Sequence, residues 1–252
     1  MTDNGRAVHI DGDQAVAAIP DPRVVHISER LARASGPAAP ARPAPPPRPR
    51  DPGTDRLRTA RRGFLRRAVG YLAADAGVRQ FVDLGSRLPV GEGIGRAAAE
   101  YAPGSRVVYV HAESTAALPG GSGAGDHGAA VLAVERMDPD HLLAALSGRG
   151  LVDLAEPVGV LLTDAAAPDR DGAPVRDLVR ALHAALSPGA HIAVAQPAPD
   201  TADPHRREAA AAVFAPFTLI EPGLADMAWW PYPDEEVSAE PTGVLAGVGR
   251  RD

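Results

Sequence analysis

The sequence predicts an α/β protein built on a doubly wound, mostly parallel sheet. From residue 57 onward, short apolar runs alternate with segments that carry apolar residues at helical spacing. The short runs are mostly apolar, which is typical of parallel strands covered on both faces. Repeated alternation of strand and helix also implies right-handed crossovers between neighbouring strands.

Each expected element follows from its own pattern. Apolar residues at 64, 65, 68, 69 and 72 predict an amphipathic helix that ends near Gly77. The expected strands are residues 80–84, 106–110, 130–134, 158–162, 191–195, 217–220 and 244–248. The helices expected between them are residues 92–101, 139–147, 175–186 and 206–214. A long irregular segment separates the last two strands, and we expect them to pair antiparallel at one edge of the sheet.

The N-terminal part of the chain has a different composition. Residues 1–36 contain only short apolar pieces, so we expect weak order there. Residues 37–53 are rich in proline, which removes backbone donors and restricts φ. This segment is expected to be a linker, serving either as a plain spacer or as a ligand for a partner's aromatic groove. The folded domain is therefore expected over residues 57–252.

Composition excludes several kinds of chemistry. The chain has no cysteine, which excludes disulfides, thiolate metal sites and cysteine nucleophiles. All 26 basic residues are arginine, so mechanisms that need a lysine Schiff base or a P-loop lysine are excluded as well. The histidines do not follow metal-ligand spacing, and we expect no metal site.

Charge and hydropathy restrict the partners and the location. A net charge of −6 and a pI of about 5.7 argue against nucleic-acid binding, which depends on an electropositive surface. No apolar run reaches the length of about 18 residues that a membrane helix needs. The first residues lack the pattern of a secretion or transit signal, so we expect a cytoplasmic protein. The sequence leaves the oligomeric state open.

The end of the first strand in the folded domain is the most informative position for ligand binding, because ligands of doubly wound sheets bind beyond the carboxyl ends of the strands. Here that strand runs into DLGSR at residues 83–87, where Gly85 permits a tight turn and close approach of the backbone to a ligand. The dinucleotide pattern G-x-G-x-x-G is not met, because glycines at 91, 93 and 95 alternate strictly. An oxidoreductase is therefore the weaker interpretation, also because a Tyr-x-x-x-Lys pair is absent.

Residues 61–110 resemble an actinobacterial family of S-adenosylmethionine-dependent methyltransferases. The matching segments read RRGFLRRAVGYLA at 61–73, FVDLGSRLPV at 81–90 and RVVYV at 106–110. Further fragments follow in the family's order, so the resemblance covers nearly all of residues 57–252. It implies a class I methyltransferase fold with a seven-stranded Rossmann-like sheet, S-adenosylmethionine as the cofactor and a small-molecule acceptor.

The resemblance also implies positions for the cofactor. Carried over by position, the methionine end would touch Asp83, Gly85 and Ser86. The ribose would lie against the segment after the second strand, which contains His111 and Glu113. The adenine would lie beside Glu135 and Arg136. The resemblance indicates neither a catalytic residue nor the identity of the acceptor.

Departures from the family pattern keep a second interpretation open. Arg87 stands where the family has a second glycine, and its side chain could crowd the cofactor. His111 stands where the family has an acid, and a neutral imidazole is a poorer acceptor for two ribose hydroxyls, although Glu113 could compensate. The family's N-terminal glycine-rich segment has no counterpart. The chain could thus be a degenerate, catalytically inactive member that serves as a binding or regulatory module.

Two further patterns have both a functional and a structural interpretation. Residues 229–232 form the densest aromatic cluster and could line an acceptor pocket or pack a loop against the sheet. Arginines at 61, 62, 66 and 67 could attract an anionic partner or form a solvated helix face. The sequence alone does not decide either pair.

Overall fold

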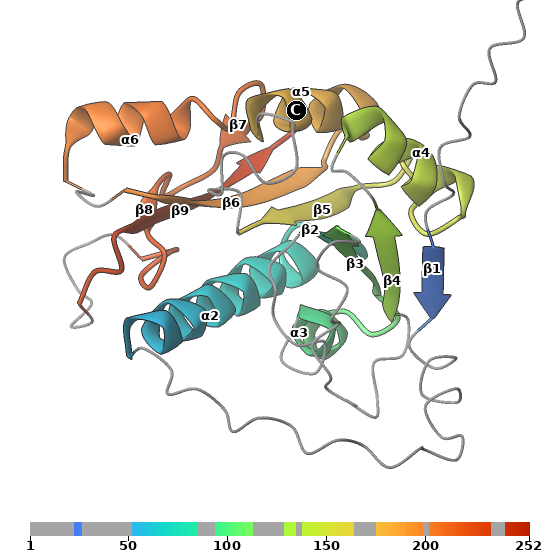
Figure 1. The fold of residues 1–252 in the computed structure, drawn as a ribbon, viewed down its shortest axis with the longest axis horizontal. Coiled ribbons are helices and arrows are strands. Elements are labelled where there is room, and N and C mark those ends of the chain that lie inside the picture. The colour runs from blue at the N-terminus through green and yellow to red at the C-terminus, as the bar shows by residue number, and fades with distance from the viewer. Residues whose placement is uncertain are drawn as a thin grey trace, which may run out of the picture.

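A computed structural model describes residues 52–84, 94–112, 129–134, 138–163, 175–198, 202–232 and 240–252, together with the backbone of 23–26. These residues form one nine-stranded sheet with helices on both faces (Figure 1). The strand order is β1-β4-β3-β2-β5-β6-β9-β7, and β8 pairs with β9. The predicted doubly wound α/β fold is confirmed.

The centre of the sheet is a block of five parallel strands. Its members, in spatial order, are β4 (Ala129–Val134), β3 (Arg106–Ala112), β2 (Gln80–Leu84), β5 (Val158–Leu162) and β6 (His191–Pro197). The antiparallel strand β9 (Val244–Arg250) lies beside β6 and pairs on its other edge with the two-residue strands β7 (Thr218–Leu219) and β8 (Ala225–Asp226). The chain leaves β2 toward β3 and later returns beside β2 as β5, so strand order reverses at β2. This reversal is the position where doubly wound sheets bind ligands.

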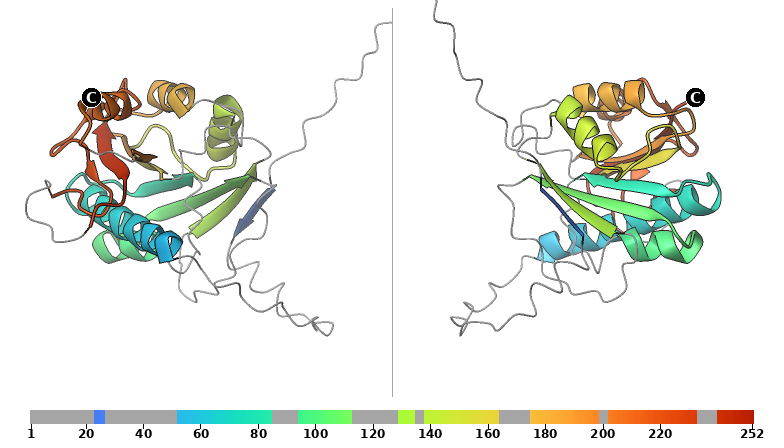
Figure 2. Two further views of the ribbon diagram at one scale, coloured as in Figure 1. Left: turned by 60° about the vertical axis from the view of Figure 1, so that its left-hand side comes forward. Right: turned by 90° about the vertical axis from the view of Figure 1, so that its right-hand side faces the viewer.

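Helices cover the two faces of the sheet as separate layers. On one face lie α2 (Pro52–Ala74) and α3 (Ile94–Tyr101), and on the other lie α4 (Pro139–Gly148), α5 (Val175–Ala185) and α6 (Pro204–Ala211) (Figures 1 and 2). Most helix bounds differ from the predicted ones by one to three residues. The largest difference is at α2, which begins at Pro52 and so includes the last two residues of the predicted linker. Proline is accepted in the first turn of a helix because the N–H that it lacks has no helical partner there.

Strand β1 (Arg23–His26) was not predicted from the sequence. It pairs antiparallel with β4 at the edge of the parallel block, within the segment for which we expected weak order. The backbone groups on the outer edge of β4 need partners, and a short strand from a distant segment satisfies them. Strands β1 and β8 were not among the seven expected strands, so the sheet has nine strands in all. The remainder of residues 1–36 and most of the linker lie outside the described residues.

The core has two parts, one on each face of the sheet. Strands β2 and β5 are buried along their whole length, although β2 carries the polar residues Gln80 and Asp83. On the α2 side, Phe64, Leu65 and Leu72 pack onto these strands. Position 159 has little room for a side chain, since a Cβ atom there would lie 3.0 Å from Cδ1 of Phe81 and 3.2 Å from Cδ1 of Leu72 in α2. This close approach lets α2 cross the sheet over β5 and β6.

His191, the first residue of β6, makes the fold sensitive to acid. Its side chain is buried, and Nδ1 has no hydrogen-bond partner in the part of the chain that the structure describes. Burial lowers the imidazole pKa below 6.5, helped by the positive charge of Arg250 and opposed by a backbone hydrogen bond to Gly189. Because the unfolded chain binds the proton more readily, the free energy of unfolding should fall as the pH drops below 6.5. We expect His191→Gln to reduce this fall by about 1 kcal/mol between neutral pH and about pH 5, measured by urea unfolding. An unchanged pH dependence in the variant would contradict this account.

Candidate functional site

Three neighbouring strands carry polar side chains at their carboxyl ends. His111 is the penultimate residue of β3, Asp83 is the penultimate residue of β2, and Thr163 directly follows β5. Asp83 pairs in register with Tyr109 of β3 and with Leu161 of β5. Side chains alternate between faces along a strand, so the three polar residues share the face that α2 and α3 cover. The fold thus gathers them where strand order reverses.

Asp83 is the central member of this group. Its side chain is only 2% exposed, and it lies between β3 and β5 on the strand at which the order reverses. Burying a carboxylate is costly unless hydrogen-bond donors or a cation surround it. A carboxylate in this place is suited to hold a cationic group at the carboxyl edge of the sheet.

His111 lies on the next strand and is half-buried. Burial lowers the pKa of its imidazole below the ordinary value of 6.5, so the ring is neutral at pH 7. A neutral imidazole can accept a hydrogen bond from a hydroxyl group. It also adds no positive charge that would repel a cationic ligand beside Asp83.

Thr163 and His111 lie on opposite sides of Asp83, because β5 and β3 flank β2. The hydroxyl oxygen of Thr163 is buried and has no hydrogen-bond partner among the described residues. A buried polar atom without a partner costs about 1–3 kcal/mol, and such atoms are uncommon in native proteins. The sequence analysis assigned no role to Thr163. The signal in the sequence that could have identified Thr163 is its position, since it is a polar residue directly after an apolar strand that pairs with β2.

Tyr109 fixes the helix that follows β2. Its hydroxyl oxygen accepts a hydrogen bond of 3.1 Å from the backbone N–H of Gly95, in the first turn of α3. This bond satisfies one of the N–H groups that have no partner within a helix. The start of α3 is therefore held beside the carboxyl ends of β2 and β3.

Of the seven predicted cofactor residues, the structure describes Asp83 and His111 and brings them to adjacent strands on one face. The other five lie outside the described residues: Gly85, Ser86, Glu113, Glu135 and Arg136. Arg87, whose side chain we considered as a possible obstruction, lies outside them too. Among the described residues, no group of three or more His, Asp or Glu side chains is arranged to hold a metal ion. No described helix is long and apolar enough to cross a membrane.

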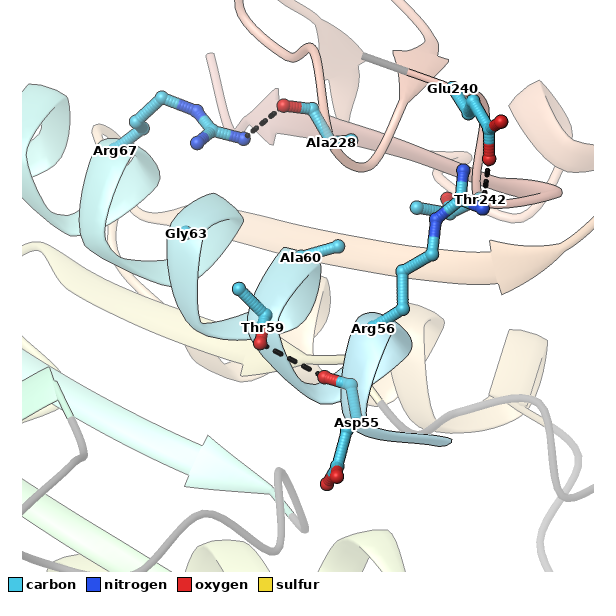
Figure 3. A pocket seen from close by; sticks show the side chains of 9 residues that line it. All are labelled: Asp55, Arg56, Thr59, Ala60, Gly63, Arg67, Ala228, Glu240 and Thr242. Carbon is cyan, nitrogen blue, oxygen red and sulfur yellow. Dashed lines mark hydrogen bonds and ion pairs between the residues drawn. The ribbon is translucent and has the colours of Figure 1, made fainter. Parts of the chain in front are cut away.

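An open cavity of about 690 Å³ lies beside α2 (Figure 3). One helix face supplies six of its lining residues: Asp55, Arg56, Thr59, Ala60, Gly63 and Arg67. The opposite wall consists of Ala228, Glu240 and Thr242. Helix α2 precedes β2 and runs antiparallel to it, so its first turn lies at the carboxyl edge of the sheet. Thr242 lies at the same edge, since β9 is antiparallel to the parallel block.

A buried carboxylate holds the wall opposite α2. Asp226 is 1% exposed and accepts hydrogen bonds from the backbone N–H groups of Ala228, Thr242 and Gly243 at 2.7–3.2 Å, and from the Thr242 hydroxyl at 2.8 Å. These four bonds tie the turn after β8 to the segment before β9. The wall is therefore preformed.

Arg67 holds the same turn from the other side. Its guanidinium donates to the backbone carbonyls of Met227, Ala228 and Trp230. Arg62 and Arg66 are exposed, so the predicted basic face is divided between solvated side chains and one that supports a cavity wall. The aromatic cluster is divided as well, since Trp230 packs edge-on against Phe64 in the core whereas the Tyr232 side chain is exposed.

Comparison with known proteins agrees with this geometry. The family model for S-adenosyl methyltransferases matches residues 48–215. A candidate methyltransferase from Thermobifida fusca YX is 29% identical in sequence, with a TM-score of 0.64 over 80% of this chain and 84% of that one. A DUF574 family protein from Streptomyces avermitilis MA-4680 is 24% identical, with a TM-score of 0.61 over 79% of this chain and 89% of that one, and supports the fold. None of the curated proteins matches the chain.

The family match spans two thirds of the chain, from the start of α2 to the end of α6, and includes β2, β3 and β5, whose ends carry Asp83, His111 and the adjoining Thr163. It confirms the resemblance drawn from the sequence. S-adenosylmethionine is the cofactor of this family, and the described polar groups at the strand ends suit its ammonium and hydroxyl groups. The chain belongs to the S-adenosyl methyltransferase family.

Proposed function

We propose that this protein transfers a methyl group from S-adenosylmethionine to a small-molecule acceptor. The observation that supports the proposal best is the placement of Asp83, His111 and Thr163 at adjacent strand ends where strand order reverses. The cavity beside α2 lies at the same edge of the sheet, over β6 and β9. One half of the edge is thus available to a cofactor and the other half to an acceptor. The absence of cysteine is consistent with action in the cytoplasm.

In this proposal the strand ends hold the cofactor. When bound, S-adenosylmethionine supplies a methyl group on a sulfonium, which passes to a lone pair of the acceptor while the carbon–sulfur electron pair stays on sulfur. The Asp83 carboxylate would hold the amino group of the methionine end, and Gly85 and Ser86 would contact the same end. His111 and Glu113 would bind the ribose hydroxyls, and Glu135 and Arg136 would lie beside the adenine.

The chain contributes mainly by positioning. The buried strand ends keep water away from the reacting groups, and the preformed wall held by Asp226 limits the positions open to an acceptor. Holding two reactants in the correct geometry can account for about 7–11 kcal/mol of the activation barrier. A methyltransferase therefore needs little chemistry from its own side chains beyond orientation.

The second candidate is a methyltransferase fold that binds ligands without turnover. It is favoured by His111, which stands at the end of β3 as a neutral imidazole where the family has an acid. Losing a charge-assisted hydrogen bond to the ribose would weaken cofactor binding about 10- to 100-fold. The fold and the cavity would be retained for a binding or regulatory role.

Isothermal titration of the full chain with S-adenosylmethionine and with S-adenosylhomocysteine tests the proposal. We expect both ligands to bind with one site per chain. No heat at millimolar ligand would contradict cofactor binding. Transfer of a labelled methyl group to any small molecule of a bacterial extract would then distinguish the enzyme from the inactive module.

Thr163 provides a separate test of the site. Thr163→Val removes a buried hydroxyl that has no partner within the described part of the chain, so we expect the free energy of unfolding to stay the same or to rise by up to about 1 kcal/mol. If the hydroxyl serves a ligand, cofactor or acceptor binding should weaken about tenfold in the same variant. Thr218→Val is the matched control, because Thr218 is exposed and bonds Asp252 at 2.8 Å, far from the site. Unchanged binding in both variants would show that Thr163 takes no part.

A further inference from the structure

The cavity beside α2 has a distinctive floor. Arg56, Ala60, Gly63 and Arg67 follow one another at intervals of four, three and four residues, which places them along one face of the helix. Two guanidinium groups therefore stand at the ends of the stripe, and two of the smallest residues stand between them. The small residues leave the volume of about 690 Å³ open, since longer side chains at 60 and 63 would project into it.

The two arginines differ in their partners. Arg56 forms an ion pair of 2.5 Å with Glu240 and donates to the backbone carbonyl of Pro241 at 3.0 Å. Arg67 donates Nε and Nη2 to three backbone carbonyls and, within the described part of the chain, pairs with no carboxylate. Its Nη1 lies over Gly63, where a Cβ atom would come within 3.0 Å of it. Among the described residues, the partners of the Arg67 guanidinium at this end of the cavity are thus backbone carbonyl dipoles.

The charges of the lining residues restrict the charge of the ligand that the cavity can bind. Glu240 is matched by Arg56, and Asp55, in the first turn of α2, has Arg58 at 4.0 Å. Arg67 is left with Nη1 available to a ligand, and burial lowers its pKa while nearby Tyr232 raises it. Arg67 therefore offers one positive charge, which a single carboxylate can match at the open edge of the guanidinium, whereas the second charge of a dianion would have no partner among these lining residues.

We propose that this cavity binds the methyl acceptor and that the acceptor carries a carboxylate anchored by Arg67. The assignment rests on the proposed methyltransferase function. The acceptor would extend along the floor formed by Ala60 and Gly63 toward Asp55 at the carboxyl edge of the sheet, where the strand ends lie. The ion pair between Arg56 and Glu240 stands beside this path (Figure 3).

A pair of small probes tests the charge requirement: 4-hydroxybenzoate and its neutral analogue 4-hydroxybenzamide. Binding of each to the full chain is followed by saturation-transfer NMR, with the affinity taken from the concentration dependence. We expect the benzoate to bind about tenfold more tightly than the amide. In Arg67→Gln this preference should disappear. Equal binding of the two probes to the unmodified protein, or a preference that survives in Arg67→Gln, would overturn the proposal.

Ala60→Leu is the second test variant. It is needed because Arg67 also holds the turn at 227–230, so Arg67→Gln could fail to fold. Ala60→Leu fills the floor without touching Arg67 and should weaken both probes about tenfold. Ala74→Leu makes the same change at an exposed position at the end of α2 and should leave probe binding unchanged. Unaltered binding in Ala60→Leu would place the probes elsewhere and refute the proposal.

Titration of the same samples with S-adenosylmethionine separates the two hypotheses. If the cofactor binds but the benzoate shows no preference, the carboxylate anchor is wrong and the proposed function stands. If the benzoate binds through Arg67 but the cofactor does not, the cavity is an anion site in a protein that is not a methyltransferase.

Discussion

Asp83→Asn is expected to weaken S-adenosylmethionine binding about 10- to 100-fold. The variant keeps the shape of the side chain but removes the negative charge that we propose to hold the ammonium group of the cofactor. A hydrogen bond to a charged group contributes about 1.5–3 kcal/mol, which corresponds to this loss of affinity. Isothermal titration at moderate salt measures the change, and thermal unfolding shows whether the variant is folded.

The comparison with S-adenosylhomocysteine identifies which charge Asp83 recognises. Both ligands carry the ammonium group, but only S-adenosylmethionine carries the sulfonium. We expect the affinity for both to fall by the same factor; a loss confined to S-adenosylmethionine would instead place the carboxylate beside the sulfonium. Asp75→Asn, an exposed position just after α2, is the control and should bind both ligands as the unmodified protein does. Undiminished affinity in Asp83→Asn would remove Asp83 from the site.

Asp226→Asn is expected to lower the free energy of unfolding by about 3 kcal/mol. The buried carboxylate accepts four hydrogen bonds, and an amide in its place would turn an NH2 group toward the N–H donors of Thr242, Gly243 or Ala228. At least one donor would lose its acceptor in a buried site. Urea unfolding at neutral pH measures the loss.

A matched substitution shows whether burial is the cause. The exposed Asp153 accepts one bond of 2.9 Å from the backbone N–H of Ala155, so Asp153→Asn should cost less than about 1 kcal/mol. A loss in Asp226→Asn no larger than this would mean that the four bonds contribute little to the fold. Because Asp226 holds the wall opposite α2, its variant should also weaken 4-hydroxybenzoate binding in whatever fraction stays folded.

The sequence predicts much of the sheet because its signals are local. An apolar run such as 158–162, bounded by polar residues and turns, identifies a buried strand without knowledge of its neighbours, and β5 occupies this range. The order of strands then brings the ends of β2 and β3 together, so both Asp83 and His111 could be assigned to a cofactor site from the fold class and the family resemblance.

Only the tertiary structure revealed the cavity and the residues that support it. Arg67 bonds carbonyls about 160 positions away, and the sequence around it describes a helix face with four arginines, without indicating which of them is buried. Asp226 lies in an irregular segment with no periodicity, and its four donors become neighbours only when β8 pairs with β9. Strand β1 likewise depends on the free edge of β4. Periodicity reports the average environment of a segment along its length. The cavity wall, the turn held by Arg67 and the pairing of β1 depend instead on which distant backbone groups need partners, and only the packed chain decides that.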